Sequence, residues 1–501
     1  MITTTKLYKN IVFTTLTASV LALLSGCSTP LATQDGSIPV KPAIGKTQNS
    51  PISDLNIAIA NYQQGTSLPA TTLLQVRIGN SDDMVEIRNG GYGSDAAANP
   101  ANPMQFYVLT DRGPNADYEG KEGKGKQFLT PNYTPRIGLF ELKTDGRIEK
   151  IKEILLKDTA GNPITGLPNS SKLGGTGELA YDVQGKIIAT DASKPFDEKS
   201  NPSKTDNFGL DSEGLVALKD GTFWVSDEYG PHLVHFDANG REINRINAFE
   251  SDERNNVIIN GKKILLPGEF ANRRANRGME GLTITPDQTT LVGIMQSTLA
   301  NPDKAVTKQN ITRIVTVNLK TGDIGQYLYK QEKAENSNSG IVALDNRHFL
   351  VIERDGEFEL QKPGAQKHIY KIALDGATNL EAIMPTANVQ QDSRLGLTLA
   401  GKTVEQYLSA AGNSDAGWTA LTTTGIKPVS KTLVLDAVKA FGYPHDKLEG
   451  MWLMGDGRLG LLNDDDFATW SNDNVLEQKY LDSAMTDIDS DRLYIATGLD
   501  Y

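Results

Sequence analysis

A short β-hairpin unit that recurs along the chain constrains the fold more than any other feature. In its clearest copy Glu213-Gly214 opens an apolar run, Lys219-Asp220-Gly221 forms a turn, and a second run ends at Asp227-Glu228. Short β-branched and aromatic runs bounded by Asp, Asn and Gly are typical of antiparallel hairpins. Five further units, two of them weak, begin near Gly93, Glu178, Glu280, Ser339 and Glu449. We therefore expect a chain built from hairpins, most of which begin at an acidic anchor.

This repetition predicts an all-β fold, a β-propeller of six or seven blades. A β-sandwich would contain similar strands, but it gives no reason for the same acidic anchor at each hairpin start. The stretch 381–440 interrupts the pattern, and the runs 403–408 and 432–441 have helical character. We expect one propeller domain over residues 70–501, with a short, partly helical insertion at about 381–440.

The amino terminus is typical of a secretion signal. Two lysines precede an uncharged apolar run, residues 11–24, which is too short to cross a membrane as a helix. The run ends at Leu24-Ser25-Gly26-Cys27, which resembles a bacterial lipobox and contains the only cysteine of the chain. An ordinary signal peptide with a cysteine nearby by chance is the alternative. We expect residues 1–26 to be a lipoprotein signal peptide.

The lipobox resemblance implies a place in the cell. In bacterial lipoproteins the cysteine carries the lipid, with acyl chains such as palmitate, and becomes the first residue of the mature protein. Ser28 follows Cys27 where an aspartate would imply retention in the inner membrane. We expect a lipid-anchored protein of the bacterial cell envelope, at the outer membrane and facing the periplasm or the exterior. Residues 27–69 would comprise the lipidated cysteine and a flexible tether.

Charge and cysteine content exclude several classes of function. The net charge is −12, and it becomes −14 once the two lysines of the signal are removed. A nucleic-acid partner is not expected, because binding phosphates needs a positive surface. A single cysteine excludes an intramolecular disulfide and a multi-cysteine zinc or iron–sulfur site. His232 and His235, three residues apart at a strand start, are interpreted as structural.

The acidic anchors predict a metal site. In an antiparallel hairpin the start of the first strand lies beside the end of the second, so Glu213 is expected to meet Asp227 and Glu228. If the first strands are the inner ones, every blade delivers such groups to one rim, and this ring requires counter-ions. Oxygen donors suit hard divalent ions, Ca²⁺ above all. Simple turn chemistry is the competing interpretation for any one anchor. The expected metal ligands are Asp111, Glu178, Glu213, Asp227, Glu280, Glu353, Asp355, Glu449 and Asp464.

Arginines stand next to several anchors. Arg112 follows Asp111, Arg354 follows Glu353, and Arg277 lies shortly before Glu280. The planar guanidinium group binds phosphate or carboxylate through two parallel hydrogen bonds. Acids that bind metal, mixed with arginines, predict a pocket for an anionic substrate, with Arg112, Arg277 and Arg354 as its binding groups. Neutralisation of the acidic ring by these arginines is the alternative.

Four of these segments resemble the bacterial phytase-like family, whose description is esterase-like activity of phytase. They are 111–115 (Asp-Arg-Gly-Pro-Asn), 226–231 (Ser-Asp-Glu-Tyr-Gly-Pro), 277–282 (Arg-Gly-Met-Glu-Gly-Leu) and 445–450 (His-Asp-Lys-Leu-Glu-Gly). Residues 463–467 resemble its terminal Asn-Asp-Asn-Asp-Phe, with Asp465 in place of Asn. The resemblance covers about residues 70–470. It implies a propeller and a phosphoesterase chemistry built on the repeated Glu and Asp.

The leading hypothesis is a metal-dependent phosphoester hydrolase, anchored to the envelope and acting on an anionic small molecule. Two alternatives stay open, a non-catalytic propeller that presents a binding rim and a lactonase-type propeller with one metal. No residue pattern separates phytate from a nucleotide or a phospholipid as substrate. The expected catalytic residues are Asp111, Glu213, Asp227, Glu228, Glu280, Glu353 and Glu449.

Overall fold

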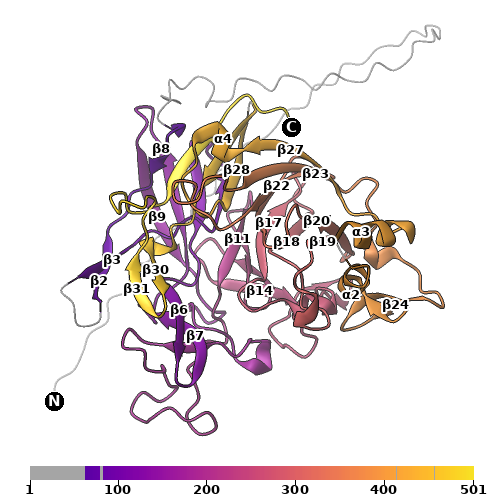
Figure 1. Ribbon diagram of the computed structural model, residues 1–501, viewed down its shortest axis with the longest axis horizontal. Helices are drawn as coiled ribbons and strands as arrows, with labels where there is room; N and C mark the ends of the chain where they lie inside the picture. Colours follow the sequence, from indigo (N-terminus) through magenta and orange to yellow (C-terminus); the bar gives the residue numbers. More distant parts are fainter. Residues whose placement is uncertain (1–61, 79–82, 413, 456) are drawn as a thin grey trace, which may run out of the picture. The chain divides into compact units, whose positions relative to one another are not determined.

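Antiparallel sheets of four strands dominate the computed structural model, which describes residues 62–78, 83–412, 414–455 and 457–501. The expected signal peptide, Cys27 and most of the expected tether lie outside the described residues. Among the described helices, none is both long enough and apolar enough to span a membrane. The described residues belong to one unit by their contacts, 49–501. The predicted all-β class is confirmed (Figure 1).

Five four-stranded sheets form the body of the molecule, and the innermost strand of each contacts the innermost strands of the neighbouring sheets. From its innermost strand outward, the first sheet comprises β4 (Asp95–Ala98), β5 (Gln105–Leu109), β8 (Arg136–Leu142) and β9 (Ile148–Leu155). The second comprises β11 (Ser212–Ala217), β12 (Phe223–Asp227), β13 (His232–Phe236) and β14 (Glu242–Asn247). The next two are β17 (Met279–Ile284), β18 (Thr290–Met295), β19 (Ile311–Asn318) and β20 (Ile324–Lys330), then β21 (Ser337–Ala343), β22 (His348–Arg354), β23 (Lys367–Ala373) and β27 (Ser430–Asp436). The last comprises β28 (Gly450–Gly455), β29 (Arg458–Leu462), β32 (Arg492–Ala496) and β1 (Thr66–Ser67).

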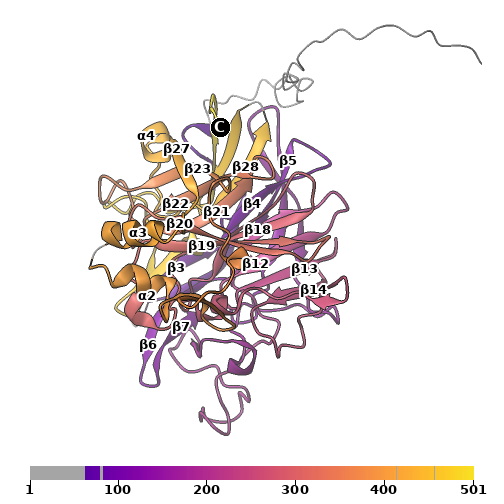
Figure 2. The ribbon, with the colours of Figure 1, turned by 90° about the vertical axis from the view of Figure 1, so that its right-hand side faces the viewer.

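The first strands of these sheets contact one another in a closed cycle. β4 contacts β11, β11 contacts β17, β17 contacts β21, β21 contacts β28, and β28 contacts β4. The other strands of each sheet follow outward in order, as β12, β13 and β14 do in Figure 2. The last sheet receives its outermost strand, β1, from the other end of the chain. The arrangement is β-propeller-like.

Six or seven blades were predicted, whereas the described residues form five four-stranded sheets. The unit expected at Glu178 does not form one. Its strand β10 (Leu179–Tyr181) pairs in parallel with β7 (Gly123–Phe128), which pairs with β6 (Asn115–Gly120) in a separate three-stranded sheet. Residues 180–188 make only a short antiparallel turn, with a bridge between Tyr181 and Ile187, and the free edge of β10 pairs with β7.

Each pair of neighbouring sheets encloses its own apolar core. Between the first and second sheets, Leu109 and Ile137 pack with Phe223 and Val225. Corresponding buried clusters lie between the second and third sheets, the third and fourth, the fourth and fifth, and the fifth and first. Burial of these apolar faces, which contributes roughly 25 cal/mol per Å², therefore holds the ring together at five separate interfaces.

Glycines that follow the anchors, such as Gly214 after Glu213 and Gly340 after Ser339, let the inner strands approach one another closely. A Cβ on Gly214 would lie 2.7 Å from the backbone nitrogen of Leu282 on the neighbouring strand. One on Gly340 would lie 2.6 Å from the carbonyl oxygen of Glu449. Real Cβ atoms do not come this close to backbone atoms. The repeated Glu-Gly sequence therefore has a packing reason as well as a chemical one.

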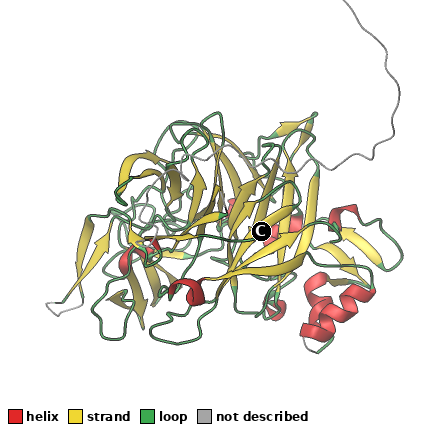
Figure 3. Cartoon of the chain, turned by 90° about the horizontal axis from the view of Figure 1, so that it is seen from above, coloured by secondary structure: helices red, strands yellow, loops and turns green. Residues whose placement is uncertain are grey.

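The predicted insertion contains helices and strands. Its helices are α2 (Val404–Ser409), α3 (Ser414–Thr423), α4 (Ala437–Phe441) and the 3₁₀ turn η4 (Leu380–Ala382), and its small sheet comprises β24 (Val389–Asp392), β25 (Gly396–Leu399) and β26 (Lys402–Thr403). Helices α2 and α3 pack beside β19 and β20, to one side of the sheets (Figures 1 and 3). The helix expected over 432–441 is confirmed for its second half, which is α4, and wrong for its first half, because β27 completes the fourth sheet there.

Short elements connect the sheets. Two-stranded sheets pair β2 (Thr72–Arg77) with β3 (Met84–Arg88), β15 (Ile258–Ile259) with β16 (Lys262–Lys263), and β30 (Thr469–Asn472) with β31 (Val475–Gln478). The remaining 3₁₀ turns are η1 (Ser171–Leu173), η2 (Gly268–Asn272), η3 (Lys304–Val306) and η5 (Asp466–Ala468). Several of these segments lie next to the functional residues described below.

Candidate functional site

A polar cavity of about 320 Å³ opens where the inner strands begin. Glu213 belongs to β11, Glu280 to β17 and Ser337 to β21, while Glu449 directly precedes β28. A second cavity of about 290 Å³ is lined by later residues of all five inner strands, and these are mostly apolar. The charged groups therefore gather at one end of the ring only.

Seven carboxylates and five cationic side chains line this polar cavity. The lining residues are Asp111, Arg112, Asn115, Lys126, Asp211, Glu213, Glu228, Ala275, Asn276, Arg277, Glu280, Gln296, Ser337, Arg354, Lys447, Glu449 and Asp466. A larger cavity, of about 890 Å³, is lined mainly by apolar and uncharged polar side chains of the β2, β6, β7 and β31 region. We take the smaller one as the candidate site, because only there do titratable groups converge.

β-Bulges aim the anchors into the cavity. The pairing of β11 with β12 shifts register between Ser212 and Gly214, which places Glu213 on a bulge. The pairing of β17 with β18 shifts in the same way around Glu280. A bulge bends the strand and redirects one side chain. The same local distortion therefore presents an acidic residue from two successive sheets.

The densest part of the site is an acidic trio, Asp211, Glu213 and Glu228. One carboxylate oxygen from each lies within 4.8 Å of the others, and all three side chains are buried. The backbone N–H of Glu228 donates to the carbonyl of Asp211 at 2.9 Å, which holds the two segments together. Burial, reinforced by the neighbouring carboxylates, raises the pKa values of Glu213 and Glu228 well above the usual range. The trio therefore favours a bound cation or bound protons.

Asp111 and Arg112 join this trio from the end of the first sheet. Asp111 accepts a hydrogen bond from the N–H of Gly113 at 2.8 Å, and burial raises the pKa of its carboxyl group. The Arg112 guanidinium lies 3.0 Å from Asp211 and 3.0 Å from Glu178. Arg112 therefore neutralises acidic neighbours, which is the alternative role that the sequence left open.

Glu280 and Gln296 lie together, as the hairpin geometry predicts. The Gln296 amide donates to Glu280 and, at 3.2 Å, to Glu228, and its oxygen accepts from Arg277 at 2.8 Å. The second carboxylate oxygen of Glu280 is buried and has no hydrogen-bond partner among the described residues. This chain of contacts connects the second and third sheets across the cavity.

Glu449 forms the opposite wall with two cations. Arg354 forms an ion pair with Glu449, and Lys447 lies 3.0 Å from Asp464 and 2.6 Å from Asp466. Burial raises the pKa of Glu449 to about 8, although both cations oppose the shift. This wall therefore places positive charge close to a carboxyl group that is protonated at neutral pH.

Five of the predicted site residues do not line the cavity. Asp227 accepts the N–H groups of Gly230 and His232, Glu353 accepts from Tyr329 and Lys431, and Asp355 binds Lys367. Glu178 binds Arg112, and Asp464 binds Lys447. Asp227 and Glu353 are each followed by a residue that does line the cavity, because successive side chains of a strand point in opposite directions.

Sequence reasoning missed several lining residues, chiefly Asp211, Lys447 and Asp466. Asp211 and Lys447 each stand two positions before an anchor, Glu213 and Glu449. In extended backbone, residues two apart share a face. The two-residue spacing from an anchor could therefore have identified Asp211 and Lys447 as lining residues.

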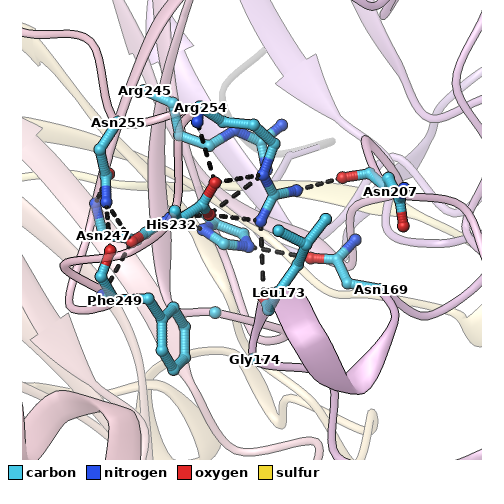
Figure 4. A network of polar contacts seen from close by, with 12 residues as sticks. Asn169, Leu173, Gly174, Asn207, His232, Arg245, Asn247, Phe249, Arg254 and Asn255 are labelled. Atoms are coloured by element: carbon cyan, nitrogen blue, oxygen red, sulfur yellow. Dashed lines mark hydrogen bonds and ion pairs between the residues drawn. The ribbon is translucent and has the colours of Figure 1, made fainter.

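His232 lies in a buried network of polar contacts, which fits the structural role that the sequence indicated for it. His232 is fully buried, and its Nε2 and Nδ1 atoms contact Asn169 and Asn247 at 2.9 and 3.1 Å. Figure 4 shows this network, which Arg254 extends to the carbonyl oxygen of Asn207. Burial lowers the pKa of His232 well below its usual value, so the ring is neutral. The network fixes the turn that follows Glu228.

The chain was compared with known proteins. It is 33% identical over 178 residues to a protein of Arthroderma benhamiae that is described as an uncharacterized secreted protein. The match covers 32% of this chain and 34% of that relative. The chain thus spans about a third of the length of the relative that it matches.

Solved structures show only distant similarity. The aldose sugar dehydrogenase of Streptomyces coelicolor, with bound PQQ, is 12% identical with a TM-score of 0.30 over 86% of this chain and 100% of that chain. The Cps50 (Swd1) β-propeller domain from Myceliophteria thermophila is 11% identical with a TM-score of 0.27 over 80% and 98%. Scores of this size do not establish a shared fold.

A family model gives a broader match. The model described as phytase-like, esterase-like activity of phytase, matches residues 87–467, which is more than half of the chain. The matched range includes every residue that lines the polar cavity. The chain therefore belongs to the phytase-like family.

Proposed function

We propose that the protein is a metal-dependent phosphoester hydrolase whose reaction takes place in the polar cavity. The acidic trio carries the proposal: Asp211, Glu213 and Glu228 place three buried carboxylates within 4.8 Å of one another. Membership of the phytase-like family supports hydrolase chemistry. The cationic side chains of the same cavity support an anionic substrate.

The residues present fit a hard divalent cation such as Ca²⁺. All the donors of the trio are carboxylate oxygens, the ligands that Ca²⁺ and Mg²⁺ prefer. Close to the trio, a buried oxygen of Glu280 has no hydrogen-bond partner among the described residues. Asp211, Glu213 and Glu228 would hold the ion. When bound, such an ion polarises a phosphoryl oxygen and makes a bound water more acidic.

Arg277 is the side chain best suited to bind the substrate anion. The other four lining cations, Arg112, Lys126, Arg354 and Lys447, each contact a carboxyl group directly. In the part of the chain that the structure describes, Arg277 has no ion pair, and its guanidinium donates to the neutral amide oxygen of Gln296. It is half-buried at the cavity. Arg277 would therefore orient a phosphoryl group and offset the charge that develops on it.

Protonated carboxyl groups of the cavity would complete the chemistry. Glu449 has a pKa of about 8, so at neutral pH it holds a proton that it can donate to a leaving oxygen. A hydrogen bond from Arg354 orients its carboxyl group. Because the cavity walls are buried, few water molecules compete for these contacts, and electrostatic interactions are stronger there than in bulk solvent.

The first prediction tests the metal and Arg277 together, with p-nitrophenyl phosphate and bis(p-nitrophenyl) phosphate as substrates. Chelation should abolish hydrolysis, and Ca²⁺ should restore it. Arg277→Ala should lower kcat/KM by about 100-fold, the usual loss for one donor to a developing anion, while Arg277→Lys should retain part of the activity. Glu198→Gln, at an exposed acid outside the cavity, serves as the control.

Two results would contradict the proposal. Undiminished hydrolysis in chelator would exclude the metal-dependent mechanism. Stabilisation of the protein by Ca²⁺ and phosphate esters without any turnover would instead identify a binding module.

We also propose a location in the cell envelope, anchored through a lipid on Cys27. The resemblance of residues 24–27 to a lipobox supports this location. That the relative from Arthroderma benhamiae is described as secreted is consistent with export. The partners proposed are a small phosphoester and the membrane, through the anchor, and not nucleic acid.

A further inference from the structure

A second acidic cluster lies beside the polar cavity, and none of its three members lines that cavity. Asp464 and Asp465 follow β29, and Asp491 directly precedes β32. One carboxylate oxygen from each lies within 4.8 Å of the others. The three side chains are 2%, 1% and 3% exposed, so they are almost completely withdrawn from water. Like charges placed this close in a buried position require compensation.

Two oxygen atoms of this cluster lack a partner. Asp465 uses Oδ1 to accept the N–H groups of Gly91 and Phe467, at 3.0 and 2.9 Å, and Asp491 uses Oδ2 to accept the N–H of Tyr92 at 2.9 Å. The other oxygens, Asp465 Oδ2 and Asp491 Oδ1, are buried without a hydrogen-bond partner among the described residues. Leaving a buried ionised oxygen unsatisfied is strongly unfavourable.

The nearby lysines pair with Asp464 and with acids around the cluster, but not with Asp465 or Asp491 in the described residues. Lys447 pairs with Asp464 and with Asp466. Lys479 pairs with Asp446, Asp466 and Asp489. Across the described ranges, no ion pair reaches Asp465 or Asp491. The protein thus supplies cations to the rim of this cluster and leaves its centre without one.

We propose that a hard divalent cation, Ca²⁺ foremost, binds between Asp464, Asp465 and Asp491 at a structural site. The two unpartnered oxygens are its ligands, together with an oxygen of Asp464. Carboxylate oxygens suit Ca²⁺ in number and in kind. Because the cluster is buried, the ion has no open position for a substrate, and its role is to hold chain segments together. The site is distinct from the acidic trio, although Lys447 connects Asp464 to the lining of the polar cavity.

The ion would join three segments where the first and last sheets meet. The two carboxylates already bind the backbone of Gly91 and Tyr92, shortly before β4. Gly90 lies against both groups, since a Cβ there would be 3.1 Å from an oxygen of Asp465 and of Asp491. The other two segments, 464–467 and 489–491, flank strands of the last sheet. The ion would therefore hold the first and last sheets together where the ring closes, and we call this proposed site the clasp.

The test measures bound Ca²⁺ by native mass spectrometry and thermal unfolding of the purified protein, with and without chelator. Asparagine keeps the shape and the acceptor oxygen of aspartate but removes its charge. The double variant Asp465→Asn, Asp491→Asn should bind one Ca²⁺ fewer than the wild type, and its Tm should respond less to chelator. Glu213→Gln, Glu228→Gln is the matched double variant at the cavity, and it should keep the clasp ion. An unchanged ion count in the first variant would overturn the proposal.

Hydrogen exchange of the wild-type protein gives a test that needs no variant. Removal of Ca²⁺ should accelerate exchange of the Gly91 and Tyr92 N–H groups at least tenfold. If chelation accelerates exchange only around residues 211–228, no ion binds at the second cluster. Shared protons would then compensate Asp465 and Asp491, and the clasp would be wrong. Loss of hydrolysis without change at Gly91 and Tyr92 would leave the proposed function standing and reject the clasp. Faster exchange at Gly91 and Tyr92 without loss of hydrolysis in chelator would support the clasp and reject the metal-dependent function.

Discussion

Neighbouring acidic residues at the end of one strand have different surroundings in this protein. Glu228 lines the cavity, whereas Asp227 accepts backbone N–H groups in the turn that follows. Arg354 lines the cavity, whereas Glu353 is buried against Tyr329 and Lys431. The sequence predicts where along the chain the site lies, because hairpin ends are readable. It does not predict which of two neighbours faces inward, because register shifts near the starts of β11, β17 and β21 change the phase.

The second prediction separates the two neighbours. Glu228→Gln should reduce hydrolysis by at least about 100-fold, since it removes a charge from the trio. The Tm of this variant in chelator should not fall, because fewer like charges repel one another. Asp227→Asn keeps the acceptor oxygen for Gly230 and His232, so activity should remain within a few-fold of wild type. Equal losses of activity in the two variants would show that Asp227 belongs to the site.

At the scale of elements, hairpins with clear turns were predictable and isolated runs were not. Four of the predicted units correspond to the sheets that begin with β11, β17, β21 and β28, and the weak first unit to the sheet of β4. The unit at Glu178 is wrong because its strand pairs with β7, which is distant in sequence. The local sequence of residues 432–436 favours a helix, but these residues pair with β23. Pairing with a neighbouring strand overrides the local helical preference.

The third prediction concerns the glycines of the inner strands. Gly340→Ala should lower stability by about 1–3 kcal/mol, the usual range for overpacking a tight site. Its new Cβ would meet the backbone of Glu449, which cannot move without disturbing the cavity. Gly356→Ala is the control, since nothing lies within 4 Å of its Cβ position. Denaturant unfolding of both variants gives the comparison, and equal stabilities would show that the inner strands are not closely packed.

At the scale of the whole molecule, the ring closes with residues from before the predicted domain start. The domain was expected from residue 70, yet Tyr62 and Leu68 belong to the apolar core between the first and last sheets, and β1 completes the last sheet. The sequence pattern gives little indication of β1, because a strand of two residues is too short to show an alternation of apolar and polar side chains. Closure of a ring by distant segments depends on long-range pairing, which sequence pattern alone does not reveal.

The fourth prediction tests this closure by truncation. A protein that begins at residue 70 should unfold at a lower temperature than one that begins at residue 50, because it loses Tyr62, Leu68 and β1. Removing a large buried side chain alone costs about 2–5 kcal/mol. Tyr62→Phe, in the longer protein, is the control for the hydrogen bond to Gly146, which is worth about 1 kcal/mol. Equal Tm values for the two lengths would show that the ring closes without the amino-terminal segment.

Truncation and removal of Ca²⁺ should not act independently. The clasp at Asp465 and Asp491 and the packing of Tyr62 stabilise the same junction between the first and last sheets. Perturbations of one shared interface are non-additive. Chelator should therefore lower the Tm of the truncated protein by less than it lowers that of the longer one. Equal shifts would indicate that the two features stabilise separate parts of the ring, and would place the chelator effect at the cavity instead.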